Sequence, residues 1–303
     1  MRQPLASIVI PTRNGVSTLP ALLDAIARQR IDGPFEAIAV DSGSTDGSLE
    51  LLRGRVDRLI TIPPGTFDHG ATRNLAIEQA QGDLIVLIVQ DAVPASDTWL
   101  AALTAPLRAD AGLAGTFARQ IPRSDASALA RRSLDRWAGA SPTARTMTVA
   151  NAAEFDALTP AARLERCTFD NVCSCIRRSV WRRHPFHPTP IAEDVEWARD
   201  VLLAGHRLAY TPEAAVVHSH DRSAQYEFAR TYVLHRRLHE LFGLRTIPSA
   251  FGLSRAVLSS LGAHLRCEAS ARAVALAVAW PLGQYLGALS SARGWKPLRT
   301  RLV

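Results

Sequence analysis

The residues best suited to chemistry occur in short polar groups within the first hundred positions. The stretch TFDHGATRN, residues 66–74, places a carboxylate, an imidazole, a glycine, a guanidinium and an amide close together. Three further groups each follow an apolar run, and they are Thr12–Asn14, Asp41–Ser44 and Gln90–Asp91. A single group of this kind is typical of a helix cap. Four groups that meet at one edge of a sheet indicate a binding site.

Two groups of titratable residues in the second half extend this chemistry. Glu193 and Asp194 begin a predicted helix, where the helix dipole also favours acidic residues, so helix capping is the alternative interpretation. A carboxylate at such a place can accept a proton from a hydroxyl group. His218 and His220 end a predicted strand, and residues two apart on a strand point the same way. Both imidazoles are therefore expected to face one crevice.

Alternating strand and helix patterns position these groups. Apolar runs at 7–11, 35–41, 56–62 and 83–90 predict strands, with helices at 18–29, 47–55 and 70–80 between them. This alternation predicts right-handed crossovers and a parallel sheet, whose strands end at one crevice. Further along, the pattern predicts a helix at 124–138, then a helix ended by Gly205 and a strand that runs up to the two histidines.

The composition places the positive charge in one region. The chain has 303 residues, 47% of them hydrophobic, and a formal net charge of +7. Residues 221–303 contain twelve Arg and Lys against four Asp and Glu, whereas the rest of the chain is nearly neutral. The four cysteines are too few and too unevenly spaced for a disulfide scaffold or a zinc site, which favours free thiols. No signal-peptide pattern precedes the first strand, so we expect a cytoplasmic protein.

Four segments occur in this order along the chain: SIVIPTRN, VDSGSTDGS, GATRNLAIEQAQGDLIVLIVQDA and AEDVEWARDVLLAG. Together they resemble glycosyltransferase family 2, the inverting nucleotide-sugar transferases with a GT-A fold. TFDHGATRN with QDA, EDVEWA and VVHSH resembles the bacterial rhamnosyltransferase branch, whose members extend O-antigen and related polysaccharides. The resemblance covers roughly residues 5–240. It implies an α/β catalytic domain over 1–220 with a mostly parallel sheet flanked by helices, a donor half of about 1–95, an acceptor half of about 96–220, and a C-terminal helical extension over 221–303.

The resemblance also implies a role for each polar group. Asp194 corresponds to the catalytic base, and Asp91 to the last acidic residue of the DXD motif, whose first acid is replaced in Val89-Gln90-Asp91. Asp91, His218 and His220 are then the expected ligands of Mg²⁺ or Mn²⁺, with His218 slightly favoured. Ser42 stands where relatives often have a second Asp. The implied donor-binding residues are Pro11, Thr12, Arg13, Asp41, Ser42, Asp68, His69, Gly70, Arg73, Gln90 and Asp91.

The implied reaction is the transfer of one sugar to an acceptor. L-rhamnose from dTDP-rhamnose is favoured, and the expected acceptor is a glycan or a polyprenyl-diphosphate-linked sugar. Transfer of another hexose from a UDP- or GDP-sugar is the alternative within the class, and a catalytically silent nucleotide-sugar-binding scaffold is the alternative outside it. No Q-x-x-R-W motif follows the HSH segment, which disfavours a processive synthase. No G-x-G-x-x-G follows the first strand, which disfavours a dehydrogenase.

The basic tail has two segments with distinct patterns. Residues 223–243 interleave aromatic residues and leucines with arginines, and residues 271–289 are strongly apolar but contain Arg272, Pro281 and Gln284. The second segment is a marginal candidate for a membrane span. The pattern predicts a peripheral region that rests on an anionic inner leaflet, and the alternative is a helical lid on the catalytic domain. The tail lacks a nucleic-acid-binding module, so no nucleic acid partner is expected.

Overall fold

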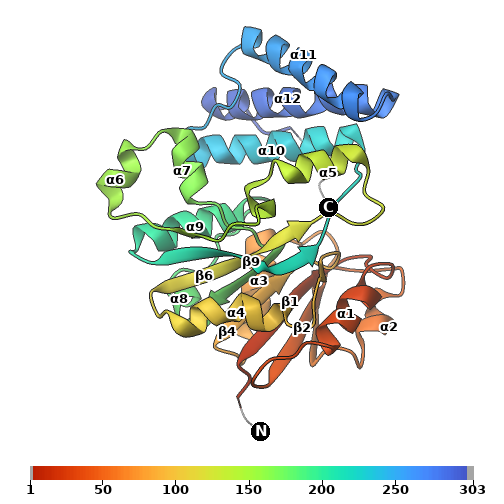
Figure 1. Cartoon of the computed structure of the whole chain (residues 1–303), viewed down its shortest axis with the longest axis vertical. Coiled ribbons are helices and arrows are strands. Elements are labelled where there is room, and N and C mark those ends of the chain that lie inside the picture. Colours follow the sequence, from red (N-terminus) through yellow and green to blue (C-terminus); the bar gives the residue numbers. More distant parts are fainter. Residues whose placement is uncertain (1–2, 299–303) are drawn as a thin grey trace. The chain divides into compact units, whose positions relative to one another are not determined.

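A computed structural model describes residues 3–298 of the chain as an α/β protein (Figure 1). The strands are β1 (Ala6–Thr12), β2 (Phe35–Asp41), β3 (Arg58–Thr61), β4 (Leu84–Ile88), β5 (Val93–Pro94), β6 (Leu113–Ile121), β7 (Arg145–Met147), β8 (Cys173–Arg177) and β9 (Arg207–Val217). The α-helices are α1 (Leu19–Ala27), α2 (Ser48–Leu52), α3 (His69–Glu78), α4 (Trp99–Ala109), α5 (Ala128–Asp135), α6 (Ala152–Ala157), α7 (Pro160–Arg166), α8 (Arg178–Trp181), α9 (Glu193–Leu203), α10 (Ala224–Phe242), α11 (Ala250–Cys267) and α12 (Ala271–Ala292), and Ala138–Ala140 forms a 3₁₀ helix.

The first four strands form the parallel sheet that their apolar runs predict. β1 pairs in parallel with β2 and with β4, and β2 pairs in parallel with β3. Ile8 and Ile10 of β1 are fully buried, and they belong to one core cluster with Leu19, Leu22 and Ile26 of α1. The strands therefore end together at one edge, with Thr12 opposite Asp41.

The second half makes the sheet mixed. β8 runs antiparallel between β4 and β6, β9 runs parallel to β6, and the short strands β5 and β7 each pair antiparallel with β9. The order along the sheet is β3-β2-β1-β4-β8-β6-β9-β5, and β7 lies off this path beside β9. α4 packs against β6, β8 and β9. Since β8 is antiparallel, its amino end lies beside the carboxyl end of β4, where Ile88 pairs with Cys173.

Some element ends differ from the sequence expectations, and two differences matter for the site. β4 ends at Ile88 instead of residue 90, so Gln90 and Asp91 lie in the turn that follows it. β9 ends at Val217, so His218 and His220 lie just beyond the strand, and the expected alternation of strand side chains does not orient them. The four cysteines are free, as expected, and Cys173 and Cys175 lie in the core.

The chain divides into two compact units. The first comprises the described residues up to Arg123, Trp137–Glu154 and Arg166–His218, and it contains the sheet. The second comprises Ser124–Arg136, Phe155–Glu165 and the described residues from Ser219 onward. The second unit therefore draws two short insertions from the middle of the chain. The boundary near residue 220 that the sequence suggests stays a prediction.

The second unit is built on two helices that lie side by side, α10 and α12 (Figure 1). Gly287 of α12 allows the close approach, because a Cβ there would overlap the carbonyl oxygen of Tyr232. The Tyr232 hydroxyl also donates to Ser290 Oγ at 3.0 Å. By length and composition α12 is the one helix among the described residues that is apolar enough to cross a membrane, and half of its most apolar window is buried in the structure.

Candidate functional site

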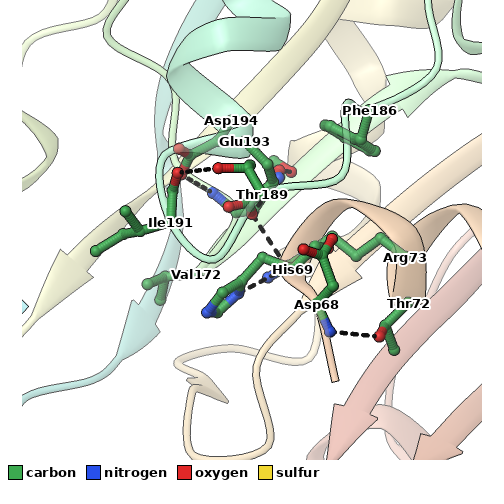
Figure 2. Close-up of polar contacts among 12 residues, drawn as sticks. Asp68, His69, Thr72, Arg73, Val172, Phe186, Thr189, Ile191, Glu193 and Asp194 are labelled. Atoms are coloured by element: carbon green, nitrogen blue, oxygen red, sulfur yellow. Dashed lines mark hydrogen bonds and ion pairs between the residues drawn. The ribbon is translucent and has the colours of Figure 1, made fainter. Parts of the chain in front are cut away.

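The TFDHGATRN stretch begins α3, and its first polar residue caps that helix. Asp68 Oδ1 accepts a hydrogen bond from the Ala71 N–H at 2.8 Å, and the Asp68 N–H donates to Thr72 Oγ1 at 3.2 Å. These bonds satisfy an N–H group that the helix itself leaves without a partner. Figure 2 shows the bond to Thr72. Capping therefore accounts for Asp68, and its expected contact with a donor stays a prediction.

Two further residues of the stretch hold α3 against a distant segment. Asn74 donates from Nδ2 to the Phe186 carbonyl at 2.8 Å, and its Oδ1 accepts from Trp181 Nε1 at 2.8 Å. Gly70 lies against the same segment, and a Cβ there would overlap the His187 carbonyl oxygen. Gly70 and Asn74 thus join α3 to the segment that precedes the acidic pair.

Gly70→Ala is expected to destabilise the protein. The added methyl group meets a backbone carbonyl that cannot rotate away, so overpacking should lower the free energy of unfolding by about 1–3 kcal/mol. Gly262→Ala in α11 is the control, because an added Cβ there meets only the end of the Arg266 side chain at 3.6 Å, and alanine is favoured in helices by about 0.5–1 kcal/mol. Urea unfolding of both variants checks this, and equal stability would contradict the close contact.

Arg73 joins α3 to the acidic pair at the start of α9 (Figure 2). Its NH1 lies 3.0 Å from Glu193 Oε1, and the side chains are 4% and 5% exposed. The same nitrogen is 3.1 Å from His69 Nδ1 and donates to the His69 carbonyl at 3.0 Å. One terminal nitrogen of the guanidinium is thus engaged within the protein, and the expected role of Arg73 as a donor contact stays a prediction.

The two carboxyl groups of the acidic pair have opposite pKa shifts. Burial alone would raise the pKa of Glu193, but the charges of Arg73 and His69 and a hydrogen bond from Asn171 hold that pKa below its ordinary value. For Asp194, burial raises the pKa well above its ordinary value. The carboxylates of Glu193 and Asp170 raise it further, against hydrogen bonds from the backbone of Asn171 and Val195. Environments that separate two carboxyl pKa values in this way are typical of acid–base sites.

The backbone before the pair is constrained as well. Ala192 has a φ of 62°, in the left-handed region that residues other than glycine seldom adopt. The turn around it is closed by Thr189, whose hydroxyl donates to the Ile191 carbonyl at 3.1 Å (Figure 2). Strained backbone conformations persist where the surroundings fix them, and they are common at functional sites.

The turn after β2 is organised around a buried aspartate. Asp41 Oδ1 accepts from the N–H groups of Gly43 and Ser44 at 3.0 and 2.9 Å, and Ser44 Oγ donates to Oδ2. Ser42, which replaces the expected second acid, donates from its N–H and its hydroxyl to the Thr12 carbonyl. The ends of β1 and β2 are therefore joined, as the sequence predicts for a shared edge.

Gln90 fixes the loop after β1. The Arg13 N–H donates to Gln90 Oε1 at 2.9 Å, and Gln90 Nε2 donates to the Arg13 carbonyl at 3.0 Å. Gly15 gives this amide its space, since a Cβ there would lie 2.5 Å from Gln90 Oε1. Gln90 therefore acts on the loop of Pro11, Thr12 and Arg13, and its direct contact with a donor stays a prediction.

The three expected metal ligands come together. The ligand atoms of Asp91, His218 and His220 lie within 4.8 Å of one another, and His218 Nε2 is 3.6 Å from Asp91 Oδ1. Two atoms that share one cation at about 2.1 Å each lie within ~4.2 Å of each other, so the Asp91–His218 distance fits a shared ion. One carboxylate and two imidazoles suit Mn²⁺ better than Mg²⁺, which prefers oxygen ligands.

Sequence reasoning missed three residues that surround these groups. Asn171 donates from its N–H to Asp194 Oδ2 at 3.2 Å and from its side chain to Glu193 Oε1 at 3.1 Å. Asp170 and Gln120 are hydrogen-bonded to each other, and Gln120 Oε1 is 2.8 Å from His218 Nδ1. The sequence pattern that could have indicated Asp170 and Asn171 is an Asp-Asn pair just before an apolar run. Because β8 runs antiparallel to β4, this pair lies at the edge where β4 ends.

Comparison with known proteins gives two consistent kinds of match. The model of the family described as "Glycosyl transferase family 2" matches residues 7–166. The O-antigen chain rhamnosyltransferase RfbN of Salmonella typhimurium is 32% identical over 231 residues, which cover 75% of this chain and 70% of that protein.

Two solved structures are similar in fold at lower identity. The mannosyltransferase PcManGT from Pyrobaculum calidifontis, in complex with GDP-Man and Mn²⁺, gives a TM-score of 0.53 at 20% identity over 98% of this chain and 77% of that one. Glucosyl-3-phosphoglycerate synthase from Mycobacterium tuberculosis, with Mn²⁺, UDP-glucose and phosphoglyceric acid, gives 0.56 at 19% identity over 82% and 81%. At these identities the likeness concerns the fold.

Proposed function

Because the chain belongs to glycosyltransferase family 2 and has the GT-A fold, we propose that it moves a single L-rhamnose from dTDP-rhamnose to a lipid-linked or polysaccharide acceptor in cell-surface glycan synthesis. The observation that carries the reaction type is the Asp194 carboxyl group, whose raised pKa suits proton transfer. The similarity to an O-antigen rhamnosyltransferase over most of both chains supports the choice of sugar.

In this proposal Asp194 is the general base of a single displacement. It accepts the proton of the acceptor hydroxyl as the oxygen attacks the sugar, and inversion follows because the leaving group departs on the opposite side. Asn171 holds one carboxylate oxygen through its N–H, which orients the group. Glu193, ionised and paired with Arg73, supplies the neighbouring charge that keeps Asp194 basic.

The donor is assigned to the edge formed by the ends of β1, β2 and β4. Thr12, Arg13 and the Asp41 turn are proposed to hold the nucleoside, supported by the hydrogen bonds that join these loops. Asp91, His218 and His220 would hold a divalent cation. A bound Mn²⁺ would neutralise the negative charge that develops on the departing nucleoside diphosphate.

A donor screen tests the proposed sugar. The purified protein is incubated with Mn²⁺ and each of dTDP-rhamnose, UDP-glucose, UDP-galactose and GDP-mannose, and release of the nucleoside diphosphate is followed. We expect dTDP-rhamnose to be turned over fastest. A preference for a UDP- or GDP-sugar would replace the sugar assignment and keep the reaction type. Binding without turnover of any donor, with or without acceptor lipid extract, would favour a silent scaffold.

Metal dependence should follow from the carboxylate–imidazole cluster. Chelation is expected to stop transfer and Mn²⁺ to restore it, with Mg²⁺ less effective because of the two imidazoles. Asp91→Asn removes a proposed ligand, so it should weaken Mn²⁺ binding by more than the about 10- to 100-fold lost when an outer hydrogen-bond partner of a ligand is removed. Titration of Mn²⁺ by electron paramagnetic resonance checks this, with Asp97→Asn as the control, since the Asp97 side chain is 45% exposed and pairs with Arg28. Full activity in chelator would show that cationic side chains alone stabilise the diphosphate.

We also propose that the protein works at the cytoplasmic face of the cell membrane. The basic second unit supports this, because anionic lipids attract clusters of Lys and Arg. A lipid-linked acceptor would be met at the same surface.

A further inference from the structure

α11 exposes a row of large apolar side chains. Phe251, Leu258 and Leu265 are 73%, 69% and 45% exposed, and they are spaced seven residues apart. Residues seven apart lie on nearly the same face of a helix, two turns from each other. Only Ala263 and His264 of this helix are buried. We call the row formed by Phe251, Leu258 and Leu265 the apolar row of α11.

The charged residues on α11 and just before it are all basic. Arg245, Arg255 and Arg266 are exposed, and no acidic residue occurs between Glu240 and Glu268. Arg255 and Arg266 lie on the side of the helix next to the row, given the 100° that separates successive residues. A long arginine side chain can extend to a polar boundary while its methylene groups cover apolar surface.

α12 contains the segment that the sequence suggests for membrane contact, but it packs largely inside the second unit. Its Gly283 and Gly287 lie against the backbone of α10, and half of its most apolar window is buried. Val274 and Val278 are its large exposed apolar side chains, at 42% and 38%. α12 therefore serves mainly in the core of the second unit, and α11 presents the larger free apolar surface.

We propose that α11 lays its apolar row on an anionic lipid bilayer, with Arg255 and Arg266 at the level of the phosphate groups. This proposal rests on the membrane location proposed above and names the element responsible. A second copy of the chain is a poorer occupant, because its own α11 face would bring Arg255 and Arg266 and no carboxylate to pair with them. Lipid phosphates supply the missing negative charge.

Vesicle co-sedimentation of the full chain tests the apolar row. Vesicles of phosphatidylcholine with 30% phosphatidylglycerol are compared with pure phosphatidylcholine, without donor or acceptor, so binding is measured independently of transfer. Phe251→Ser with Leu258→Ser is expected to reduce binding at least tenfold. Val274→Ser with Val278→Ser on α12 is the matched control and should change it less than twofold. Arg255→Gln with Arg266→Gln should remove the preference for anionic vesicles.

Three outcomes would overturn the proposal. They are unchanged vesicle binding by the α11 variant, loss of binding by the α12 control alone, and a dimer in gel filtration that the α11 variant dissolves while vesicle binding persists. Removing exposed apolar side chains should not impair folding, and thermal unfolding verifies that each variant is folded. If the parent protein binds vesicles but transfers no sugar, the proposed function is wrong and the α11 proposal still stands.

A second inference concerns the hydrogen bonds behind His218. Gln120 Nε2 donates to Asp170 Oδ2, and the Val172 N–H donates to Asp170 Oδ1 at 2.8 Å. A carboxylate oxygen accepts hydrogen bonds, so Asp170 fixes the Gln120 amide with its NH₂ group turned toward the carboxylate. The carbonyl oxygen, Oε1, then faces His218 Nδ1 at 2.8 Å.

This arrangement selects one tautomer of His218. Since Gln120 Oε1 can only accept, Nδ1 must carry the hydrogen, and the lone pair of the neutral ring is on Nε2. Nε2 is the atom that lies 3.6 Å from Asp91 Oδ1. A lone pair facing a carboxylate is unfavourable unless a cation lies between them. The tautomer therefore fits a metal site that Asp91 and His218 share.

We infer that Gln120 and Asp170 are positioning residues that prepare His218 to bind metal through Nε2. Gln120→Leu removes the acceptor and should weaken Mn²⁺ binding about 10- to 100-fold, as outer hydrogen-bond partners of metal ligands do. Asp170→Asn frees the Gln120 amide to turn over, so a smaller loss is expected. Calorimetric titration with Mn²⁺ alone measures both, and Gln29→Leu, a glutamine that bonds the backbone of Ser96, is the control.

The tautomer can also be observed without any variant. In protein labelled with ¹⁵N-histidine, His218 should show a protonated Nδ1 and an unprotonated Nε2 at high pH without metal, and a diamagnetic Mg²⁺ or Zn²⁺ probe should shift the Nε2 signal while Nδ1 stays protonated. A proton on Nε2 would overturn the inference, as would wild-type Mn²⁺ affinity in a folded Gln120→Leu variant. A loss of thermal stability alone, with unchanged metal affinity, would show that the two residues act only on the fold.

Discussion

Asp194→Asn is expected to lower the rate of sugar transfer by about 10²–10⁴-fold, the range attributed to a positioned general base. Asparagine has the same shape and still accepts the Asn171 N–H bond, but it cannot take a proton from the acceptor hydroxyl. Donor affinity should stay within a few-fold of the parent, because the proposed base acts on the acceptor. Steady-state kinetics and donor titration measure the two effects.

The same variant should change how stability depends on pH. The pKa of Asp194 in the folded protein is raised, mainly by burial, so the folded state retains a proton that the unfolded chain releases near pH 3.9. Stability therefore falls as pH rises from about 4 toward the raised pKa. Asp194→Asn removes this loss, so its stability relative to the parent should increase across that window.

Asp200→Asn is the matched control on the same helix. The Asp200 side chain is 25% exposed and pairs with Arg199 and His187. It lies six residues after Asp194 and has no part in the proposed proton transfer. Its substitution should leave transfer within a few-fold of the parent. If Asp194→Asn is folded and transfers sugar at a near-parental rate, Asp194 is not the base.

Arg73→Ala should have the largest effect on stability. Breaking a buried ion pair by removing one partner costs about 3–5 kcal/mol, because the other charge is left without compensation in a dry environment. Arg73 and Glu193 fit this case, at 3.0 Å and almost fully buried. Arg55→Ala removes a partner of Asp24 in a far more exposed pair and should cost about 0–1 kcal/mol.

Urea unfolding of Arg73→Ala, Glu193→Ala and the double variant measures the coupling. We expect the double variant to be little worse than the single ones, since removing both partners leaves no stranded charge. A loss in Arg73→Ala no larger than that in Arg55→Ala would contradict the role of the pair. A large loss of donor affinity with little loss of stability would instead support the direct donor contact that the sequence suggests.

The sequence predicted the parts of the fold whose residues are close along the chain. The apolar runs of β1, β2 and β4 are long and directly alternate with helices, so their parallel order could be derived. β8 could not be placed, because Cys173–Arg177 joins the sheet 85 residues after β4 in an antiparallel direction. Antiparallel insertion by a distant segment leaves no local pattern, and only pairing with β4 and β6 fixes it.

The same limit explains what was missed at the site. Asp91 and Asp194 follow or begin regular elements and could be proposed from position and resemblance. Gln120 lies near the end of β6 and Asp170 just before β8, and their meeting depends on the antiparallel pairing of those strands. The polar residues of TFDHGATRN can be recognised as a group from the sequence. The sequence does not reveal that Asp68 caps α3 or that Asn74 bonds the backbone of Phe186.

The position of β8 has a consequence for synthesis on the ribosome. The segment from Ala6 to Ile88 can pair its four parallel strands as soon as it emerges, and domains tend to form from the N-terminal side during translation. The free edge of β4 then stays open until Cys173–Arg177 has been made, about 4–17 seconds later at 5–20 residues per second. An unpaired apolar edge of this kind can join the edge of another nascent chain. Slowing translation between residues 90 and 170 should therefore increase aggregation of the newly made protein more than slowing it after residue 180.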